Sequence, residues 1–213
     1  MEKNLSCANC GTINCRSLTK EFPDFCLTKN SQAENSVALA AYLEDPLTSK
    51  IAKASAEVEG IFYKQLTRVE EIMEFAMRVD IKKIGIATCG ALIEEARIFK
   101  RILDAHDFDN CTVICKVGAN DKTTIGIKPE HKLNKGKAHE SLCNPIAQAK
   151  ILNKEKTGLN VLLGLCVGHD SLFYKHSQAL CTTLITKDRV LGHNPAVALY
   201  TVKSYNKHLL QVD

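Results

Sequence analysis

The sequence predicts an α/β protein, a three-layer Rossmann-like domain built on a mainly parallel sheet of about four strands. Short apolar runs typical of buried strands occur at residues 84–88, 112–117, 161–165 and 182–186. Segments with helical spacing of apolar residues separate these runs, as between residues 92 and 103. Because strands that alternate with helices are joined by right-handed crossovers, this order predicts parallel pairing.

Two further segments precede this domain. Residues 1–30 hold four cysteines and few apolar side chains, which predicts a metal-binding knuckle. Residues 31–80 have apolar positions spaced three and four apart, interrupted at Asp45-Pro46, and they predict a helical segment that packs on the core. The Rossmann-like domain then occupies residues 81–213.

The N-terminal cysteines are spaced Cys7-x2-Cys10-x4-Cys15-x10-Cys26. A Cys-x2-Cys pair lets a tight turn direct two thiolates to one metal ion, and two further thiolates complete a tetrahedral site. So short and polar a segment needs such a link to fold. Thiolates bind both zinc and iron–sulfur clusters, so the sequence leaves the metal open. The alternative is four unrelated thiols in a polar arm.

Composition limits the class of protein. The chain has 213 residues, 45% of them hydrophobic, and no apolar run approaches the roughly 20 residues that span a membrane. The N-terminus lacks the apolar core of a signal peptide, so we expect a cytoplasmic protein with no membrane partner. Ten cysteines then favour metal or redox roles, because structural disulfides are rare in the cytosol. The oligomeric state is not defined by the sequence.

The net charge of +4 is concentrated in one segment. Residues 116–139 carry six lysines against Asp121 and Glu130, which accounts for the whole excess. Residues 119–142 have no clear period, and two interpretations stay open: a lid or binding loop for a small anionic molecule, or a solvated surface excursion. Only 6% of the residues are aromatic and none is Trp, which disfavours nucleic acid as a partner.

Soft ligands recur where the predicted strands end. Cys89 follows the first strand and Cys166 the third, while Cys143-Asn-Pro and His193-Asn-Pro each precede a predicted helix. Open α/β sheets bind ligands beyond the carboxyl ends of their strands. We therefore expect all four side chains at this edge, where helix N-termini also favour thiolates.

Three cysteines at one sheet edge predict a [4Fe–4S] cluster with one open iron, held by Cys89, Cys143 and Cys166. Residues expected to move protons and hold an anion beside it are His169, Asp170, Lys187, Asp188 and Arg189. The alternatives are reactive or inert thiols and, for the Asp188–Arg189 pair, a structural ion pair. The cysteines in or beside strands are interpreted as core thiols: Cys111, Cys115 and Cys181.

Four motifs carry a resemblance to a known family: SCANCGTINC (6–15), GIATCGAL (85–92), LCVGHDSLF (165–173) and KDRVLGHNP (187–195). Through them the chain resembles, over nearly its whole length, an uncharacterised prokaryotic family described as metal-binding. The resemblance implies metal binding, most directly at Cys7, Cys10, Cys15 and Cys26, and supplies no substrate. A weaker similarity, to small enzymes that remove sulfur from thiolated bases with a three-cysteine [4Fe–4S] cluster, lacks their order of motifs.

Three hypotheses of function follow. In the first, a metal-binding protein uses its second, three-cysteine cluster for redox or sulfur-transfer chemistry on a small anionic molecule. In the second, only the knuckle holds metal, and the α/β domain is a non-catalytic ligand-binding or sensing module. In the third, Cys89 or Cys166 is the nucleophile of a thiol enzyme, close to His169.

Overall fold

The computed structural model describes residues 5–135 and 138–211, and over these the chain forms two compact units, Met1–Tyr63 and Lys64–Asp213. The elements of the first unit are η1 (Cys7–Asn9), α1 (Asn14–Ser17), α2 (Leu27–Asn30), α3 (Gln32–Glu44) and α4 (Pro46–Ile61). Asp45 separates the last two helices: its carboxylate accepts the N–H of Thr48 at 2.8 Å, and Pro46 takes the first helical position. The predicted helix break is confirmed.

The second unit alternates strands and helices. Its helices and strands are α5 (Arg68–Arg78), β1 (Lys83–Thr88), α6 (Ile93–Ala105), β2 (Asp109–Ile114), α7 (Pro145–Lys154), β3 (Leu159–Leu163), α8 (His169–His176), β4 (Leu180–Ile185) and α9 (Ala196–Tyr200). Short 3-10 turns are η2 (Gly90–Leu92), η3 (Lys122–Ile125), η4 (Pro129–His131) and η5 (Lys207–Leu210). Within the described ranges, no helix is both long and apolar enough to cross a membrane.

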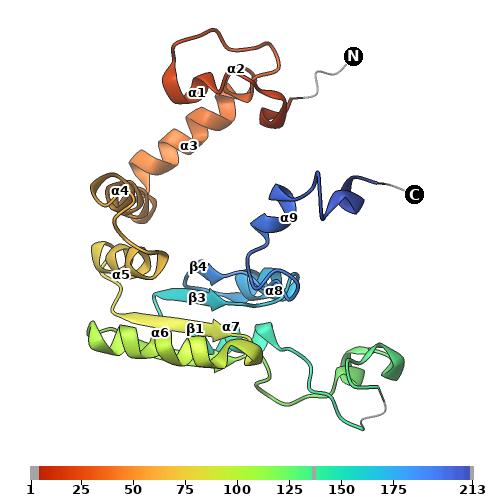
Figure 1. Ribbon diagram of the computed structural model, residues 1–213. Helices are drawn as coiled ribbons and strands as arrows, with labels where there is room; N and C mark the ends of the chain where they lie inside the picture. Colours follow the sequence, from red (N-terminus) through yellow and green to blue (C-terminus); the bar gives the residue numbers. More distant parts are fainter. Residues whose placement is uncertain (1–4, 136–137, 212–213) are drawn as a thin grey trace. The chain divides into compact units, whose positions relative to one another are not determined.

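All strands of the described sheet pair in parallel, in the order β2-β1-β3-β4. Figure 1 labels three of these strands, β1, β3 and β4, in that order across the sheet. The chain moves from β1 to β2 on one side and then crosses back over β1 to reach β3. The strand order therefore reverses between β1 and β3, and in open α/β sheets ligands bind at the carboxyl edge of such a point. The predicted Rossmann-like fold with a parallel sheet of four strands is confirmed over the described residues.

Helices cover both faces of the sheet and make three layers. On one face Ile84 and Ile86 of β1 pack with α5 and α6. On the other face Ala87 of β1 and Leu162 of β3 pack with α7 and α8. Successive residues of a strand point to opposite faces, so a strand covered on both sides must be apolar throughout. This explains the short, continuous apolar runs of the sequence.

Gln148 of α7 ties the ends of two strands together. It is 0% exposed, and its Nε2 donates to the carbonyl oxygens of Thr88 at 3.1 Å and Val113 at 2.7 Å. We expect Gln148→Met to keep the packing but to leave buried carbonyl groups with fewer donors, at a cost of about 1–3 kcal/mol in the free energy of unfolding. Urea unfolding followed by circular dichroism measures this loss.

The matched control for this prediction is Gln178→Met, because Gln178 is exposed. Surface substitutions of this kind change stability by about 0.5 kcal/mol or less. Equal effects of the two substitutions would show that the Gln148 amide does not hold the strand ends.

Candidate functional site at the carboxyl edge of the sheet

The strand ends deliver cysteines to one edge of the sheet. Cys89 directly follows β1, Cys115 directly follows β2, and Cys166 follows β3. Backbone hydrogen bonds continue the ladder past the strands: the N–H of Cys115 donates to Thr88 O at 2.8 Å, and the N–H of Cys89 donates to Leu163 O at 3.0 Å. Cys89 and Cys115 are thus positioned by the register of the sheet itself.

Cys143 reaches the same edge from the start of α7. The N–H of Asn144 donates to Cys115 O at 2.7 Å, which fixes this segment beside the end of β2. The Asn144 side chain caps the helix by accepting the N–H of Ala147 at 3.0 Å, and Pro145 opens it. The predicted helix start is confirmed, and it places Cys143 two residues before α7.

Cys115 lies at the centre of the site. Its side chain is within hydrogen-bonding range of both Cys89 and Cys143. The residue is only 3% exposed, and its Sγ also accepts the N–H of Gly90 at 3.4 Å. Three thiols from three separate segments therefore form a chain of contacts in which Cys115 is the shared member.

These contacts divide the three thiols into two kinds. The contact with Cys115 lowers the pKa of Cys89 to about 5, with help from Lys187. The contact of Cys143 with Cys115 likewise lowers the pKa of Cys143 to about 3, and His169 and Lys116 lower it further. The pKa of Cys115 is raised, because Cys143 and Cys89 accept hydrogen bonds from its thiol and because it is buried. These directions favour a protonated thiol at Cys115 between thiolates at Cys89 and Cys143.

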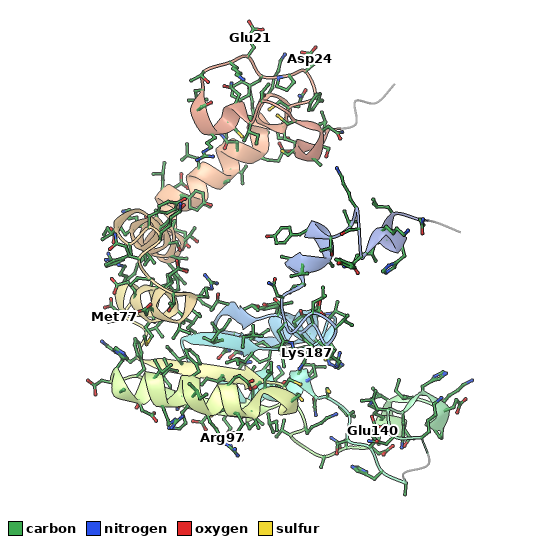
Figure 2. The ribbon with its side chains drawn as sticks, in the orientation of Figure 1. Glu21, Asp24, Met77, Arg97, Glu140 and Lys187 are labelled. Atoms are coloured by element: carbon green, nitrogen blue, oxygen red, sulfur yellow. The ribbon has the colours of Figure 1, made fainter. Side chains whose placement is uncertain are left out.

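Cations border the site on the side of β4. Arg189 donates from Nη2 to Cys166 Sγ at 2.9 Å, and this contact raises the pKa of Arg189. The charges of Cys89 and Cys143 act on the same guanidinium, so Cys166 and Arg189 belong to this edge. Lys187, labelled in Figure 2, follows β4 and contacts the thiol of Cys89.

The other predicted site residues have different surroundings. His169 reaches Cys143, as the sequence suggested. Asp170 accepts the N–H of Ser171 at 2.8 Å, and Asp188 accepts the N–H groups of Val190 and Leu191. His193 accepts the N–H of Asp188 on Nδ1 at 3.1 Å. These bonds organise the local backbone, and the N–H of Asp170 also donates to Cys166 O at 3.1 Å.

Cys111 and Cys181 lie within strands, apart from this chain of contacts. Burial raises the pKa of both thiols, which agrees with the prediction of core cysteines. Cys115 is buried as well, but its contacts make it part of the site, which the sequence interpretation missed. The available signal was its place: Cys115 follows its strand as Cys89 follows β1.

In the first unit, all four N-terminal cysteines line one small cavity of about 70 Å³, together with Phe22 and Phe25; they are Cys7, Cys10, Cys15 and Cys26. The sulfur of Cys10 accepts the N–H of Ile13 at 3.4 Å, and a contact with the Thr12 hydroxyl lowers the pKa of this thiol. Hydrogen bonds of this kind favour the thiolate form.

Across residues 5–135 and 138–211, no group of three or more Cys, His, Asp or Glu side chains is arranged to hold a metal ion. The sulfurs at the sheet edge form a chain of contacts, and those of the first unit line a cavity. The metal assignments at both sets of cysteines therefore stay predictions.

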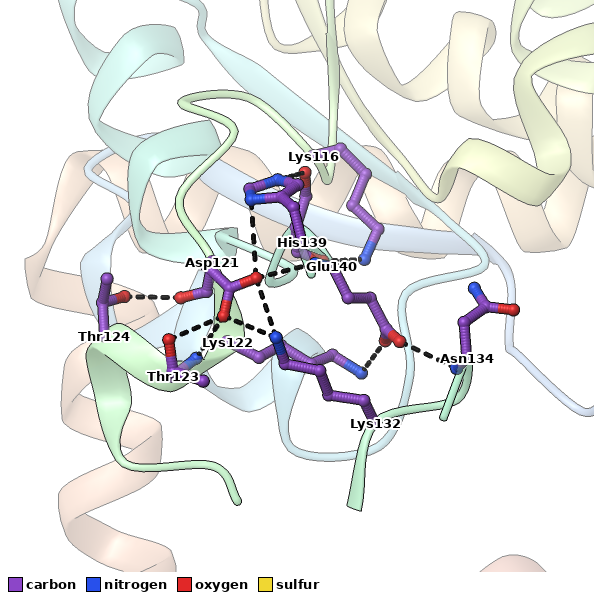
Figure 3. A network of polar contacts seen from close by, with 10 residues as sticks. Lys116, Asp121, Lys122, Thr123, Thr124, Lys132, Asn134, His139 and Glu140 are labelled. Carbon is purple, nitrogen blue, oxygen red and sulfur yellow. Dashed lines mark hydrogen bonds and ion pairs between the residues drawn. The ribbon is translucent and has the colours of Figure 1, made fainter. Parts of the chain in front are cut away.

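The basic segment between β2 and α7 is a folded excursion organised around Asp121 (Figure 3). The Asp121 carboxylate accepts from Lys132 Nζ at 2.8 Å, from the N–H of Thr123 at 2.8 Å and from the N–H of Glu140 at 2.7 Å. Lys132 is only 5% exposed, so this pair is largely withdrawn from water. These bonds give the described part of the segment a defined shape, in which the regular elements are η3 and η4.

Several lysines of this excursion are occupied within it. Lys132 pairs with Asp121, Lys122 pairs with Glu140, and Lys116 donates to Ser141 O at 2.6 Å. The expected use of the basic excess for an anion is therefore limited by internal pairing. The cations nearest the thiols on the β4 side, Lys187 and Arg189, come from outside the excursion.

We expect Asp121→Asn to loosen the excursion, because the substitution leaves the buried ammonium of Lys132 without its counter-charge. Trypsin cleavage at the lysines of residues 122–135 should accelerate on the order of tenfold, since cleavage follows local opening. Glu130→Gln, which removes an exposed carboxylate of the same segment, is the control and should leave the cleavage rate unchanged.

The same carboxylate predicts a pH dependence. Lys132 and the neighbouring N–H groups hold the pKa of Asp121 well below its ordinary value. A lowered pKa means that the stabilisation is complete above the ordinary value, near 3.9, and is lost as pH falls below it. Hydrogen exchange of this segment should therefore be insensitive to the titration of Asp121 above about pH 5. Loss of protection between neutral pH and pH 5 would contradict this assignment.

The fold and the site define a class: a Rossmann-like α/β protein with cysteines gathered at the carboxyl edge of its sheet. The chain belongs to the family described as protein of unknown function (DUF1847), which matches residues 26–184. It is similar to the uncharacterized protein MJ0455 of Methanocaldococcus jannaschii, with 51% identity over 162 residues, or 76% of this chain and 81% of that protein. No solved structure matches the chain. The family match spans Cys89, Cys115, Cys143 and Cys166 and, of the N-terminal four, Cys26.

Proposed function

We propose that this protein carries out thiolate chemistry, either redox or sulfur transfer, on a small anionic molecule at the sheet edge. The observation that carries the proposal is the contact of Cys115 with both Cys89 and Cys143. Neighbouring thiols can exchange a disulfide bond through a mixed-disulfide intermediate, and the thiolate is the form that attacks.

The surrounding charge supports an anionic substrate. Lys187 and Arg189 lie beside the thiols on the β4 side, and Lys116 lies beside Cys143. Positive groups around a cleft raise the local concentration of anions and speed their association. They also stabilise the thiolate that leaves when a sulfur–sulfur bond is broken.

An iron–sulfur cluster is a second candidate for the same edge, with Cys115 in place of Cys166 among its ligands. Cys89, Cys115 and Cys143 would then hold the iron, and the cluster would supply electron transfer or an open Lewis-acid iron. The nearby cations favour this candidate, because a cluster with three thiolate ligands carries net negative charge. His169 and Arg189 would remain to position a substrate.

We also place a metal, zinc or iron–sulfur, at the four N-terminal cysteines, supported by the cavity that they share. A structural role suits this site, because the segment has little apolar core of its own. If metal binds only there and the edge thiols are unreactive, the protein is the non-catalytic ligand-binding module instead.

The main proposal is tested by comparing how fast the thiols at the sheet edge react with an anionic and with a cationic disulfide. The reduced full chain is treated with dithiobis(nitrobenzoate), a dianionic disulfide, and separately with cystamine, a cationic one. Cys89 or Cys143 should react faster with the anion by about tenfold, and added salt should reduce the difference. Lys187→Gln combined with Arg189→Gln should remove the preference, while Lys150→Gln, on the exposed side of α7, should not. Equal rates for both disulfides would overturn the proposal.

Metal analysis after anaerobic purification separates the candidates. Iron and sulfide that are lost in Cys115→Ser but kept in Cys111→Ser would support the cluster at the edge. Zinc or iron lost only in Cys7→Ser and Cys10→Ser would locate the metal in the first unit. Cys111 is a suitable control because it precedes Cys115 in the same segment and lies outside the chain of contacts.

A further inference from the structure

Cys89 and Cys115 occupy neighbouring places in an extended ladder. The last register pair of β1 and β2 is Thr88 with Ile114, and the two cysteines are the next residue on each strand. The hydrogen bond from Cys115 N to Thr88 O keeps the chains together at this point. Adjacent strands lie about 4.8 Å apart, within the roughly 4.4–6.8 Å between Cα atoms that a disulfide requires.

The two thiols differ in their access to solvent. Cys89 is partly exposed, whereas Cys115 is buried and its sulfur accepts the N–H of Gly90, immediately after Cys89. A dissolved reagent can therefore reach Cys89 first. The sulfur of Cys115 is held over the Cys89–Gly90 turn, where it faces whatever becomes bonded to Cys89.

Charge favours the same order of events. Lys187 contacts the thiol of Cys89, and the exposed Arg189, which donates to Cys166 Sγ, lies within the fields of both Cys89 and Cys143. On the Cys143 side, Lys116 is held by the carbonyl oxygen of Ser141. Lys187 therefore favours the approach of an anionic reagent to Cys89.

We propose that Cys89 and Cys115 form a thiol–disulfide couple in which Cys89 attacks an anionic disulfide and Cys115 resolves the product. This inference rests on the proposed thiolate chemistry and names its substrate class and the role of each cysteine. Cys143 borders the couple and is not its disulfide partner.

The reaction proceeds in two balanced steps. The thiolate of Cys89 attacks one sulfur of the substrate RSSR, forms a mixed disulfide and releases RS⁻. The thiol of Cys115 then gives its proton to the neighbouring thiolate of Cys143 as its sulfur attacks Cys89 Sγ, so that the Cys89–Cys115 disulfide forms and the second RS⁻ leaves. The substrate is reduced by two electrons and the cysteine pair is oxidised by two.

Tryptic mapping of the reduced full chain after treatment with dithiobis(nitrobenzoate) tests this order. The wild-type protein should yield a disulfide between peptides 84–97 and 102–116, which contain Cys89 and Cys115. Two nitrobenzoate thiolates should be released for each such disulfide. Cys111→Ser should give the same product, which also assigns the bond, because Cys111 shares the second peptide.

Cys115→Ser should stop the reaction at the mixed disulfide on peptide 84–97, with one thiolate released. A disulfide between peptides 102–116 and 138–150, which contains Cys143, would overturn the assignment. Release of the second nitrobenzoate thiolate at an unchanged rate in Cys115→Ser would also overturn the assignment. In both cases, a fast and anion-selective reaction of an edge thiol with the disulfide would still support the proposed function. The wild-type product alone decides the pairing if the variant does not fold.

Discussion

Iodoacetamide at about pH 6 should alkylate Cys89 and Cys143 at least about tenfold faster than Cys111 and Cys181. A thiol whose pKa is about 5, as for Cys89, is roughly 90% thiolate at this pH, whereas an ordinary thiol is below about 1%. The lower nucleophilicity of an acidic thiolate removes part of this advantage. Burial raises the pKa of Cys111 and Cys181 and slows them further. Isotope-coded labelling and peptide mass analysis give the four rates in one sample.

The pH profile provides the internal control for this labelling. The rate at Cys89 should be nearly constant from about pH 8 to 6 and should fall below its pKa of about 5. Cys115→Ala removes the main cause of the lowered pKa, so labelling of Cys89 at pH 6 should slow markedly. Uniform slow labelling of all these cysteines would contradict the thiolate assignment.

Gly164→Ala should cost about 2–5 kcal/mol in the free energy of unfolding, as measured by urea denaturation. Gly164 has φ +68°, which is strained for any residue with a Cβ, at about 1–2 kcal/mol. A methyl group there would also lie 2.0 Å from Leu92 Cδ1, and Leu92 is 4% exposed and packed. Overpacking of this kind costs about 1–3 kcal/mol more.

Gly168→Ala separates the two causes. Gly168 has φ +83°, but no atom lies within 4 Å of its added Cβ, so only the backbone strain remains. We expect a loss of about 1–2 kcal/mol for this variant. If the two substitutions are equally costly, the packing of Leu92 against the end of β3 does not contribute as described.

The fold was predictable because burial on both faces leaves a direct record in the sequence. Residues 84–88 and 161–165 read as continuous apolar runs, and β1 and β3 lie there with boundaries shifted by no more than two residues. The start of α7 at Asn144-Pro145 was equally predictable, because helix capping depends on residues that are neighbours in the chain. The structure of the excursion could not be predicted. Asp121 forms hydrogen bonds with Lys132 and with the N–H of Glu140, which are distant in the chain, and the residues between them follow no helical or strand period.

The site was predictable in its location and only in part in its members. Cysteines that follow strands were expected at the carboxyl edge, and Cys89, Cys143 and Cys166 lie there. The sequence predicts a second strand that runs through Cys115 and therefore a core thiol, whereas β2 ends at Ile114. Asp170 and Asp188 were assigned to chemistry by residue type. Their described side-chain bonds go to nearby N–H groups, as is ordinary for Asp in turns and helix starts, and their role in chemistry stays a prediction.

The excursion between β2 and α7 begins and ends at almost the same place. The N–H of Leu142 donates to Asn120 O at 2.8 Å, and the N–H of Asn144 donates to Cys115 O at 2.7 Å, so its two ends are fastened together at the base. Doubling the length of a closed loop costs only about 0.6 kcal/mol. The segment can therefore be lengthened, shortened or exchanged as a module while Cys115 and Cys143 keep their places, which leaves this surface free to diversify.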